Sequence, residues 1–141
     1  MQYKITAPVS FNSKIKLPSS KSISNRALIL NALSLNSFDI ENLSDCDDTV
    51  VMVEAFTSES NLIDVKAAGT SMRFLTAFLS RTPGDWIITG TERMKERPIN
   101  ILVDALISLG ARIEYLGKPG FPPLKIKGTA LNGGVIHLSG G

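Results

Sequence analysis

The sequence predicts an α/β fold in which a unit with the element order βαβαββ, roughly fifty to sixty residues long, is repeated along the chain. Two polar turns each open an almost wholly apolar helix, one after residue 18 and one after residue 69. Each apolar helix is followed by a second helix. Residues 51–55, in the second helix of the first unit, match residues 102–105, in the second helix of the next unit. Between the helices, polar and apolar side chains alternate, which is typical of half-buried strands.

The expected elements follow in chain order. The predicted helices run from 19–22 to about 35, from 44 or 45 to 56, from 72 to 79 and from 98 to 109. The predicted strands are 13–17, 37–43, 62–65, 86–89, 111–116, 124–127 and 133–138. Pro98 suits the first helical position, where its missing N–H costs nothing, and Gly110 suits the position just after a helix.

Length and composition narrow the class of protein. A chain of 141 residues has the length of one average domain, and its hydrophobic fraction of 43% and mean hydropathy of +0.13 are typical of a soluble globular protein. No apolar run approaches a membrane span, and no targeting segment is recognisable at the start, so we expect a cytoplasmic protein with no membrane partner. A net charge of +2, with no blocks of cations, predicts no nucleic-acid partner.

The single cysteine and the single histidine offer little chemistry. One cysteine excludes an internal disulfide and is typical of a reducing compartment, and no His/Cys metal cluster can form. Because three carboxylates flank Cys46, we expect its thiol pKa to be raised and the side chain to be unreactive. His137 alternates with apolar neighbours and is expected to be an exposed strand residue.

The stretch 17–30 opens the first apolar helix and is the main candidate site. Its helix is predicted to begin between Ser19 and Ser22, and the apolar run after it predicts a helix buried on most faces. Lys21, Ser22 and Arg26 fall within the first turns, where they are expected to face one pocket beside free backbone N–H groups. This arrangement suits phosphate or carboxylate. The alternative is a solvated helix start with ordinary surface cations.

The second polar turn, at 67–71, has weaker signals. Gly69 would let a ligand approach the backbone N–H groups, although simple capping of the next helix is the preferred interpretation of this turn taken alone. Arg73 stands in an apolar helix, where its guanidinium needs a carboxylate or a ligand as partner, and an ion pair with a carboxylate is favoured. Arg97 suits a carboxylate or phosphate, and an ion pair with Glu92 or Glu96 is an equal alternative. Nucleotide-binding fingerprints are absent.

Three motifs resemble those of the 5-enolpyruvylshikimate-3-phosphate (EPSP) synthase family: LPSSKSISNRAL at 17–28, AGTSMR at 68–73 and MKERPI at 94–99. That family has the enolpyruvyl transferase fold, an inside-out α/β barrel with two lobes, each made of three βαβαββ units around buried helices. The resemblance implies that residues 18–141 form an incomplete N-terminal lobe, with two units and the start of a third. Residues 1–17 would form a hinge and strand region that belongs partly to the other lobe.

The resemblance also implies a reaction: transfer of the enolpyruvyl group of phosphoenolpyruvate to the 5-hydroxyl of shikimate-3-phosphate, a step of the shikimate pathway to aromatic amino acids. It requires neither metal nor organic cofactor. Lys21 would contact both substrates and is the candidate general acid. Ser22 and Arg26 would bind shikimate-3-phosphate.

On the phosphoenolpyruvate side, Gly69 and Thr70 would line the site, and Arg97 would hold the substrate carboxylate. The sequence departs from the family pattern at Ala67, where many members have Asn. It departs again at Phe74, where Pro or another apolar residue is frequent.

The family's Ser-Ser-Gln substrate turn and its second lobe would follow Gly141. We therefore expect an N-terminal fragment that needs the remainder of its polypeptide for activity, is inactive alone, and self-associates or is marginally stable. A binding-only anion module and an unrelated phosphometabolite-binding protein are the alternatives of other classes. The sibling UDP-N-acetylglucosamine enolpyruvyl transferase matches less well, because its counterpart of the Lys-Ser turn normally carries Lys-Asn.

Overall fold

The structure is a computed structural model and describes residues 3–10, 12–34 and 38–138. Its helices are α1 (Lys21–Leu33), α2 (Asp47–Thr57), α3 (Gly69–Arg81), α4 (Glu92–Lys95) and α5 (Asn100–Ser108). Its strands are β1 (Leu62–Asp64), β2 (Gly84–Thr89), β3 (Arg112–Tyr115) and β4 (Leu124–Gly128). None of these helices is long and apolar enough to cross a membrane.

One mixed sheet holds the described strands in the order β1-β2-β4-β3. β1 lies parallel to β2, and β4 is antiparallel to both β2 and β3. Taken in chain order, β1, α3, β2, α5, β3 and β4 form one βαβαββ unit, with the short α4 inserted before α5. The predicted α/β class and the predicted element order of this unit are confirmed.

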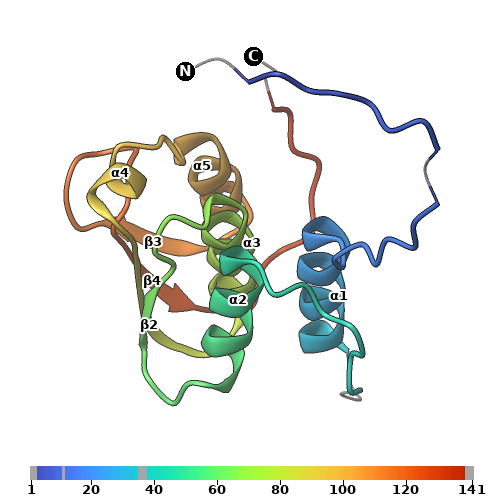
Figure 1. Ribbon diagram of the computed structural model, residues 1–141. Coiled ribbons are helices and arrows are strands. Elements are labelled where there is room, and N and C mark those ends of the chain that lie inside the picture. Colours follow the sequence, from blue (N-terminus) through green and yellow to red (C-terminus); the bar gives the residue numbers. More distant parts are fainter. Residues whose placement is uncertain (1–2, 11, 35–37, 139–141) are drawn as a thin grey trace.

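Helix α3 is the centre of the molecule. It packs against β2 and β4 on one side and against α2 on the other, and α1 packs on α2 (Figure 1). Its buried Met72, Leu75 and Leu79 belong to the same core cluster as Ile88 and Ile126 of the sheet. Helices α1, α2 and α3 run side by side with their N-terminal ends at the same end of the molecule, the upper end in Figure 1. This shared end positions the candidate site.

The strands predicted at 13–17 and 133–138 are wrong, because both segments lie in exposed, irregular backbone. An alternating pattern is a property of one segment, whereas a strand also needs hydrogen bonds from a neighbour, and here the sheet ends at β1 and β3. His137 is exposed as expected, but it is not in a strand.

The strand predicted at 37–43 is also absent over the described residues 38–43, and Ser37 lies outside them. The Asn31 side chain occupies the backbone N–H and C=O of Phe38, at 2.9 and 2.8 Å. Asn42 then adopts a left-handed conformation, with φ of 57°, which turns the chain. Both features prevent a ladder from forming here.

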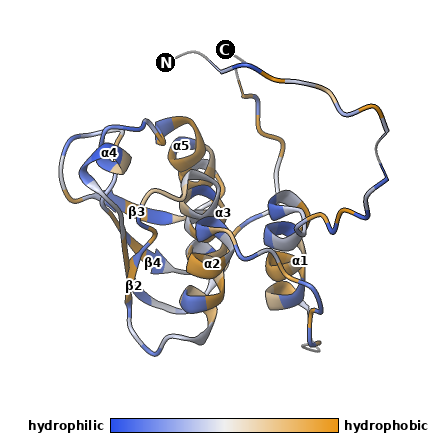
Figure 2. Ribbon diagram, viewed as in Figure 1, coloured by the Kyte–Doolittle hydropathy of each residue, from blue (hydrophilic) through white to orange (hydrophobic). Residues whose placement is uncertain are grey.

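Helix α1 is less buried than its apolar sequence predicts. Ser24, Asn25 and Leu28 are buried, whereas Ile23 is 71% exposed and Leu30 is 68% exposed. The reason is that α1 packs mainly on one neighbour, α2, and that its apolar turns, orange in Figure 2, make few contacts with α3.

The helix predicted from 98 to 109 begins two residues later. Ile99 is its N-cap, so Pro98 stands just outside α5 rather than at its first position. Because the residue before a proline disfavours helical geometry, α4 and α5 remain separate. Gly110 follows α5 with φ of +95°, as predicted for a residue just after a helix.

Candidate functional site

The first turn of α1 confirms the predicted helix start. Ser20 is the N-cap, and its hydroxyl accepts a hydrogen bond from the Ile23 N–H at 3.4 Å. Lys21 follows immediately, and its Nζ lies 3.5 Å from Asp48 Oδ2 in the first turn of α2. The Lys21 side chain is half exposed while the Asp48 side chain is mostly buried. Lys21 therefore has a fixed counter-charge, which the sequence-based analysis did not foresee.

Asp48 also links α2 to the start of α3, because its backbone carbonyl accepts a hydrogen bond of 2.7 Å from Ser71 Oγ. On the α1 side, the buried Asn25 Oδ1 accepts a hydrogen bond of 2.7 Å from Thr49 Oγ1. These contacts fix the first turns of three helices relative to one another. Free backbone N–H groups and positive dipole ends therefore point towards a common end of the molecule.

At the start of α3, the guanidinium of Arg97 rests directly on Gly69. A Cβ built on Gly69 would lie 2.8 Å from Arg97 Cζ, closer than real Cβ contacts, and 3.0 Å from Nη2, which is tighter than most. The first turn of α3 has no side-chain cap, and Thr70 lies half-buried beside Gly69. The structure thus brings Gly69, Thr70 and Arg97 together at an uncapped helix start, and an anion here would meet both a guanidinium and backbone donors.

Arg73 makes no ion pair with a carboxylate among the described residues, so that prediction is wrong. Its guanidinium donates to Gly69 O at 3.2 Å and to Pro98 O at 3.1 Å. These two hydrogen bonds therefore hold the backbone next to Arg97 against the first turn of α3. Backbone carbonyls satisfy the guanidinium without a second charge.

The alternative partners of Arg97 are not used within the described part of the chain. Glu92 pairs instead with Lys95, with Nζ 2.7 Å from Oε1, and no ion pair joins Arg97 to Glu92 or Glu96. The Arg97 guanidinium is therefore left exposed to a ligand.

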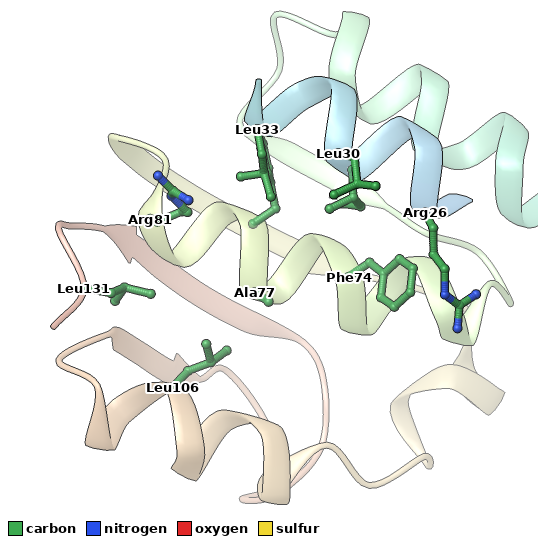
Figure 3. A pocket seen from close by; sticks show the side chains of 10 residues that line it. Arg26, Leu30, Leu33, Phe74, Ala77, Arg81, Leu106 and Leu131 are labelled. Carbon is green, nitrogen blue, oxygen red and sulfur yellow. The ribbon is translucent and has the colours of Figure 1, made fainter. Parts of the chain in front are cut away.

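Arg26 lies on a different side of α1 from the Asp48 contact. Its Nη1 donates to Ser22 O at 2.9 Å, and its Cζ lies 5.7 Å from the ring centroid of Phe74 (Figure 3). Arg26 and Phe74 form one end of an apolar groove of about 480 Å³ between α1, α3 and α5. Arg26 contacts the backbone carbonyl of Ser22 rather than its hydroxyl, and Lys21 is directed to Asp48. A single pocket shared by the side chains of Lys21, Ser22 and Arg26 stays a prediction.

The thiol of Cys46 differs from expectation. Burial raises its pKa, but hydrogen bonds from Ser44 and Thr49 lower it by more and also outweigh the charge of Asp48. The net pKa lies below its ordinary value, so the predicted increase is wrong. Within the described ranges, no group of three His, Cys, Asp or Glu side chains is placed to hold a metal ion.

Comparisons with known proteins show the family to which the chain belongs. The model of the family described as EPSP synthase (3-phosphoshikimate 1-carboxyvinyltransferase) matches residues 5–58 and 55–141. The chain belongs to the EPSP synthase family. A 3-phosphoshikimate 1-carboxyvinyltransferase of Bacteroides fragilis is 59% identical over 140 residues, which cover 99% of this chain and 34% of that protein. One from Vibrio cholerae is 40% identical over 155 residues, covering 92% and 36%.

The fold agrees with a solved EPSP synthase from Acinetobacter baumannii, with a TM-score of 0.77 at 23% identity. That likeness covers 89% of this chain and 34% of the solved chain. The chain therefore spans about a third of the length of the EPSP synthases that it matches.

Two residues near the site were not singled out for it by the sequence: Asp48, which pairs with Lys21, and Arg93, which lines a cavity with Ala67 and Arg97. The sequence pattern places Asp48 only among the carboxylates near Cys46, because nothing local shows that Lys21 reaches it. Arg93 lies four residues before Arg97, and this spacing is the signal that would have found it.

Proposed function

We propose that this chain is the N-terminal part of an enzyme that transfers the enolpyruvyl group of phosphoenolpyruvate to the 5-hydroxyl of shikimate-3-phosphate. The observation that carries the proposal is the Arg97 guanidinium held over Gly69 at the uncapped start of α3, beside a second cationic start on α1. Both substrates are small polyanions, and two such starts at one end of the molecule suit two anionic ligands.

On the phosphoenolpyruvate side, Arg97 binds the carboxylate, and the N–H groups of Gly69 and Thr70 face the same molecule. A planar guanidinium matches a carboxylate through two parallel hydrogen bonds. Because Gly69 has no side chain, the ligand can approach the backbone closely. The hydrogen bonds from Arg73 to the carbonyls of Gly69 and Pro98 keep this geometry in place, and Arg73 itself does not contact the ligand.

On the shikimate-3-phosphate side, Arg26 and Ser22 bind the phosphate. Lys21 would lie between the two substrates, and its Nζ is 3.5 Å from Asp48 Oδ2. Transfer needs proton delivery to the enolpyruvyl carbon and proton removal from the hydroxyl, and Lys21 is the group on this chain suited to act as the acid. Its other effect is electrostatic, because fixed cations around two polyanions stabilise charge in the transition state.

We further propose that residues 18–141 supply most of one lobe and that residues 1–17 form a hinge region that belongs partly to the other lobe. We also propose that the enzyme is cytoplasmic and part of aromatic amino acid biosynthesis. The remainder of the polypeptide would close over the substrates and complete the acid–base pair. The chain alone is then expected to bind substrates without turning them over.

Titration of the chain, followed by amide chemical shifts, tests the proposal. Shikimate-3-phosphate should shift the amides of residues 20–26, and phosphoenolpyruvate those of residues 69–71. Lys21→Gln should weaken both ligands, and Lys125→Gln, on the exposed face of β4, should weaken neither. Shifts elsewhere, with none at these two helix starts, would overturn the assignment.

A further inference from the structure

Another cavity, of about 470 Å³, is lined by the C-terminal halves of α1, α2 and α3 and by Trp86 of β2. It lies towards the opposite end of these helices from the candidate site, the lower end in Figure 1. Its volume falls within the range of about 300–1,000 Å³ that is usual for small-molecule sites. None of its lining residues carries a charge. The function proposed above does not use this cavity.

Three aromatic side chains line the cavity, and contacts within the protein fix their positions. The rings of Phe56 and Phe78 pack edge to face, with centroids 5.2 Å apart and an interplanar angle of 82°. Trp86 Nε1 donates a hydrogen bond of 3.0 Å to Thr82 O. The indole also lies against Gly84, where a Cβ would be 2.9 Å from Trp86 Cε2. Aromatic rings held in this way suit an apolar or aromatic group and attract a cation.

Most of the side-chain donors around the cavity are already used within the protein. The hydroxyls of Thr57 and Thr82 each donate to a carbonyl four residues earlier, at 3.0 and 2.9 Å. The Asn31 amide is occupied by the backbone of Phe38, and the indole N–H by Thr82. A hydroxyl whose proton is used still has a lone pair that can accept a hydrogen bond. The cavity therefore favours a ligand that donates hydrogen bonds.

The helix ends at this cavity lack the cations that commonly accompany them. The last four carbonyls of a helix have no partner within it, and they carry a partial negative charge. In α2, three of them belong to Ala55, Phe56 and Thr57, which all line the cavity. Neither α1 nor α2 has a basic residue in its last turn, and Arg81 of α3 lines the apolar groove between α1, α3 and α5 instead. A cation in the cavity would supply the missing charge.

We propose that this cavity binds an organic cation in which an aromatic ring is joined to an ammonium group. The ring packs among Phe56, Phe78 and Trp86, and the ammonium donates hydrogen bonds to the carbonyls at the end of α2. An anion of the same shape is disfavoured, because the cavity presents acceptors and the negative ends of helices. This site is separate from the substrate site and does not depend on the proposed function.

Phenethylammonium and 3-phenylpropionate test the proposal in the 141-residue chain, because they share a phenylethyl body and differ in the sign of the charge. Trp86 is the single tryptophan, so its fluorescence emission reports on this cavity. Phenethylammonium should bind about five- to thirtyfold more tightly than 3-phenylpropionate and should shift the amides of residues 55–58 and 82. Equal affinities for the two ligands, or no response of the emission and of these amides to phenethylammonium, would overturn the proposal.

Substitutions of Ser58, the exposed C-cap of α2, separate charge from shape. Ser58→Lys places a competing cation beside the cavity and should raise the Kd for phenethylammonium about three- to fivefold. Ser58→Gln lacks the charge and should leave that Kd within about twofold. Ser108→Lys adds the same charge at the last residue of α5, outside the cavity, and is the matched control. An unchanged Kd in a folded Ser58→Lys protein would contradict the position of the ammonium at the end of α2.

Discussion

Replacing Gly69 with alanine should separate ligand affinity from stability. The added methyl would lie 2.8 Å from Arg97 Cζ, and because that atom is at the far end of a flexible side chain, the guanidinium is expected to move rather than α3. Displacing it removes a charge-assisted contact worth about 1.5–3 kcal/mol when well formed, and solvent exposure reduces this to the lower end. We therefore expect about a tenfold increase in the Kd for phosphoenolpyruvate.

The free energy of unfolding should rise in Gly69→Ala, although the affinity for phosphoenolpyruvate falls. Gly69 is the first helical residue of α3 and its φ is not in the left-handed region, so alanine fits the backbone. Restricting the unfolded chain should then raise the stability by about 0.4–1 kcal/mol. Urea unfolding measures the change in stability, and titration with phosphoenolpyruvate measures the change in Kd.

Gly117→Ala is the matched control, since its Cβ would meet only Pro123 Cδ at 3.8 Å, an ordinary contact. The affinity for shikimate-3-phosphate should also stay unchanged in Gly69→Ala, because Arg26 lies on α1. An unchanged Kd for phosphoenolpyruvate in a folded Gly69→Ala protein would refute the placement of Arg97 in this site.

Two further perturbations test other contacts. Phe74→Leu removes the ring under Arg26, a cation–π contact worth about 0.5–1 kcal/mol at an exposed site. Shikimate-3-phosphate should then bind about two- to fivefold more weakly, and the affinity for phosphoenolpyruvate should not change. Equal losses of affinity for both ligands would contradict a role of Phe74 in positioning Arg26. Hydrogen bonds from the side chain and backbone of Lys66 hold the pKa of Asp64 below its ordinary value of 3.8, so its stabilisation is complete above that pH and is lost as the pH falls through the lower, folded value. Because the pair is exposed, Asp64→Asn should remove less than about 1 kcal/mol of this acid dependence in urea unfolding, and an identical pH profile in both proteins would exclude the contribution.

Features that depend on a few neighbouring residues were predictable from the sequence. The Ser20 hydroxyl caps α1 through an N–H three residues away, and Gly110 ends α5 through its own backbone conformation. The apolar spacing of α3 likewise predicts its burial, because one helix face is filled by residues of one segment.

Features that depend on distant partners were not predictable. Lys21 finds Asp48 on another helix, and Arg73 finds the carbonyl of Pro98 rather than a carboxylate. The alternation at 13–17 looks like a strand, yet the sheet ends before reaching it. In each case, the deciding contact is with a residue or strand far away in the sequence, which local patterns and propensities do not identify.

The most direct measurement joins residues 1–141 to the remaining two thirds of the Bacteroides fragilis relative and follows phosphate release from phosphoenolpyruvate. The account predicts release that requires shikimate-3-phosphate, is lost in Lys21→Met and does not occur with the chain alone. A folded chimaera that binds neither substrate, or turnover by the unsubstituted chain on its own, would contradict it.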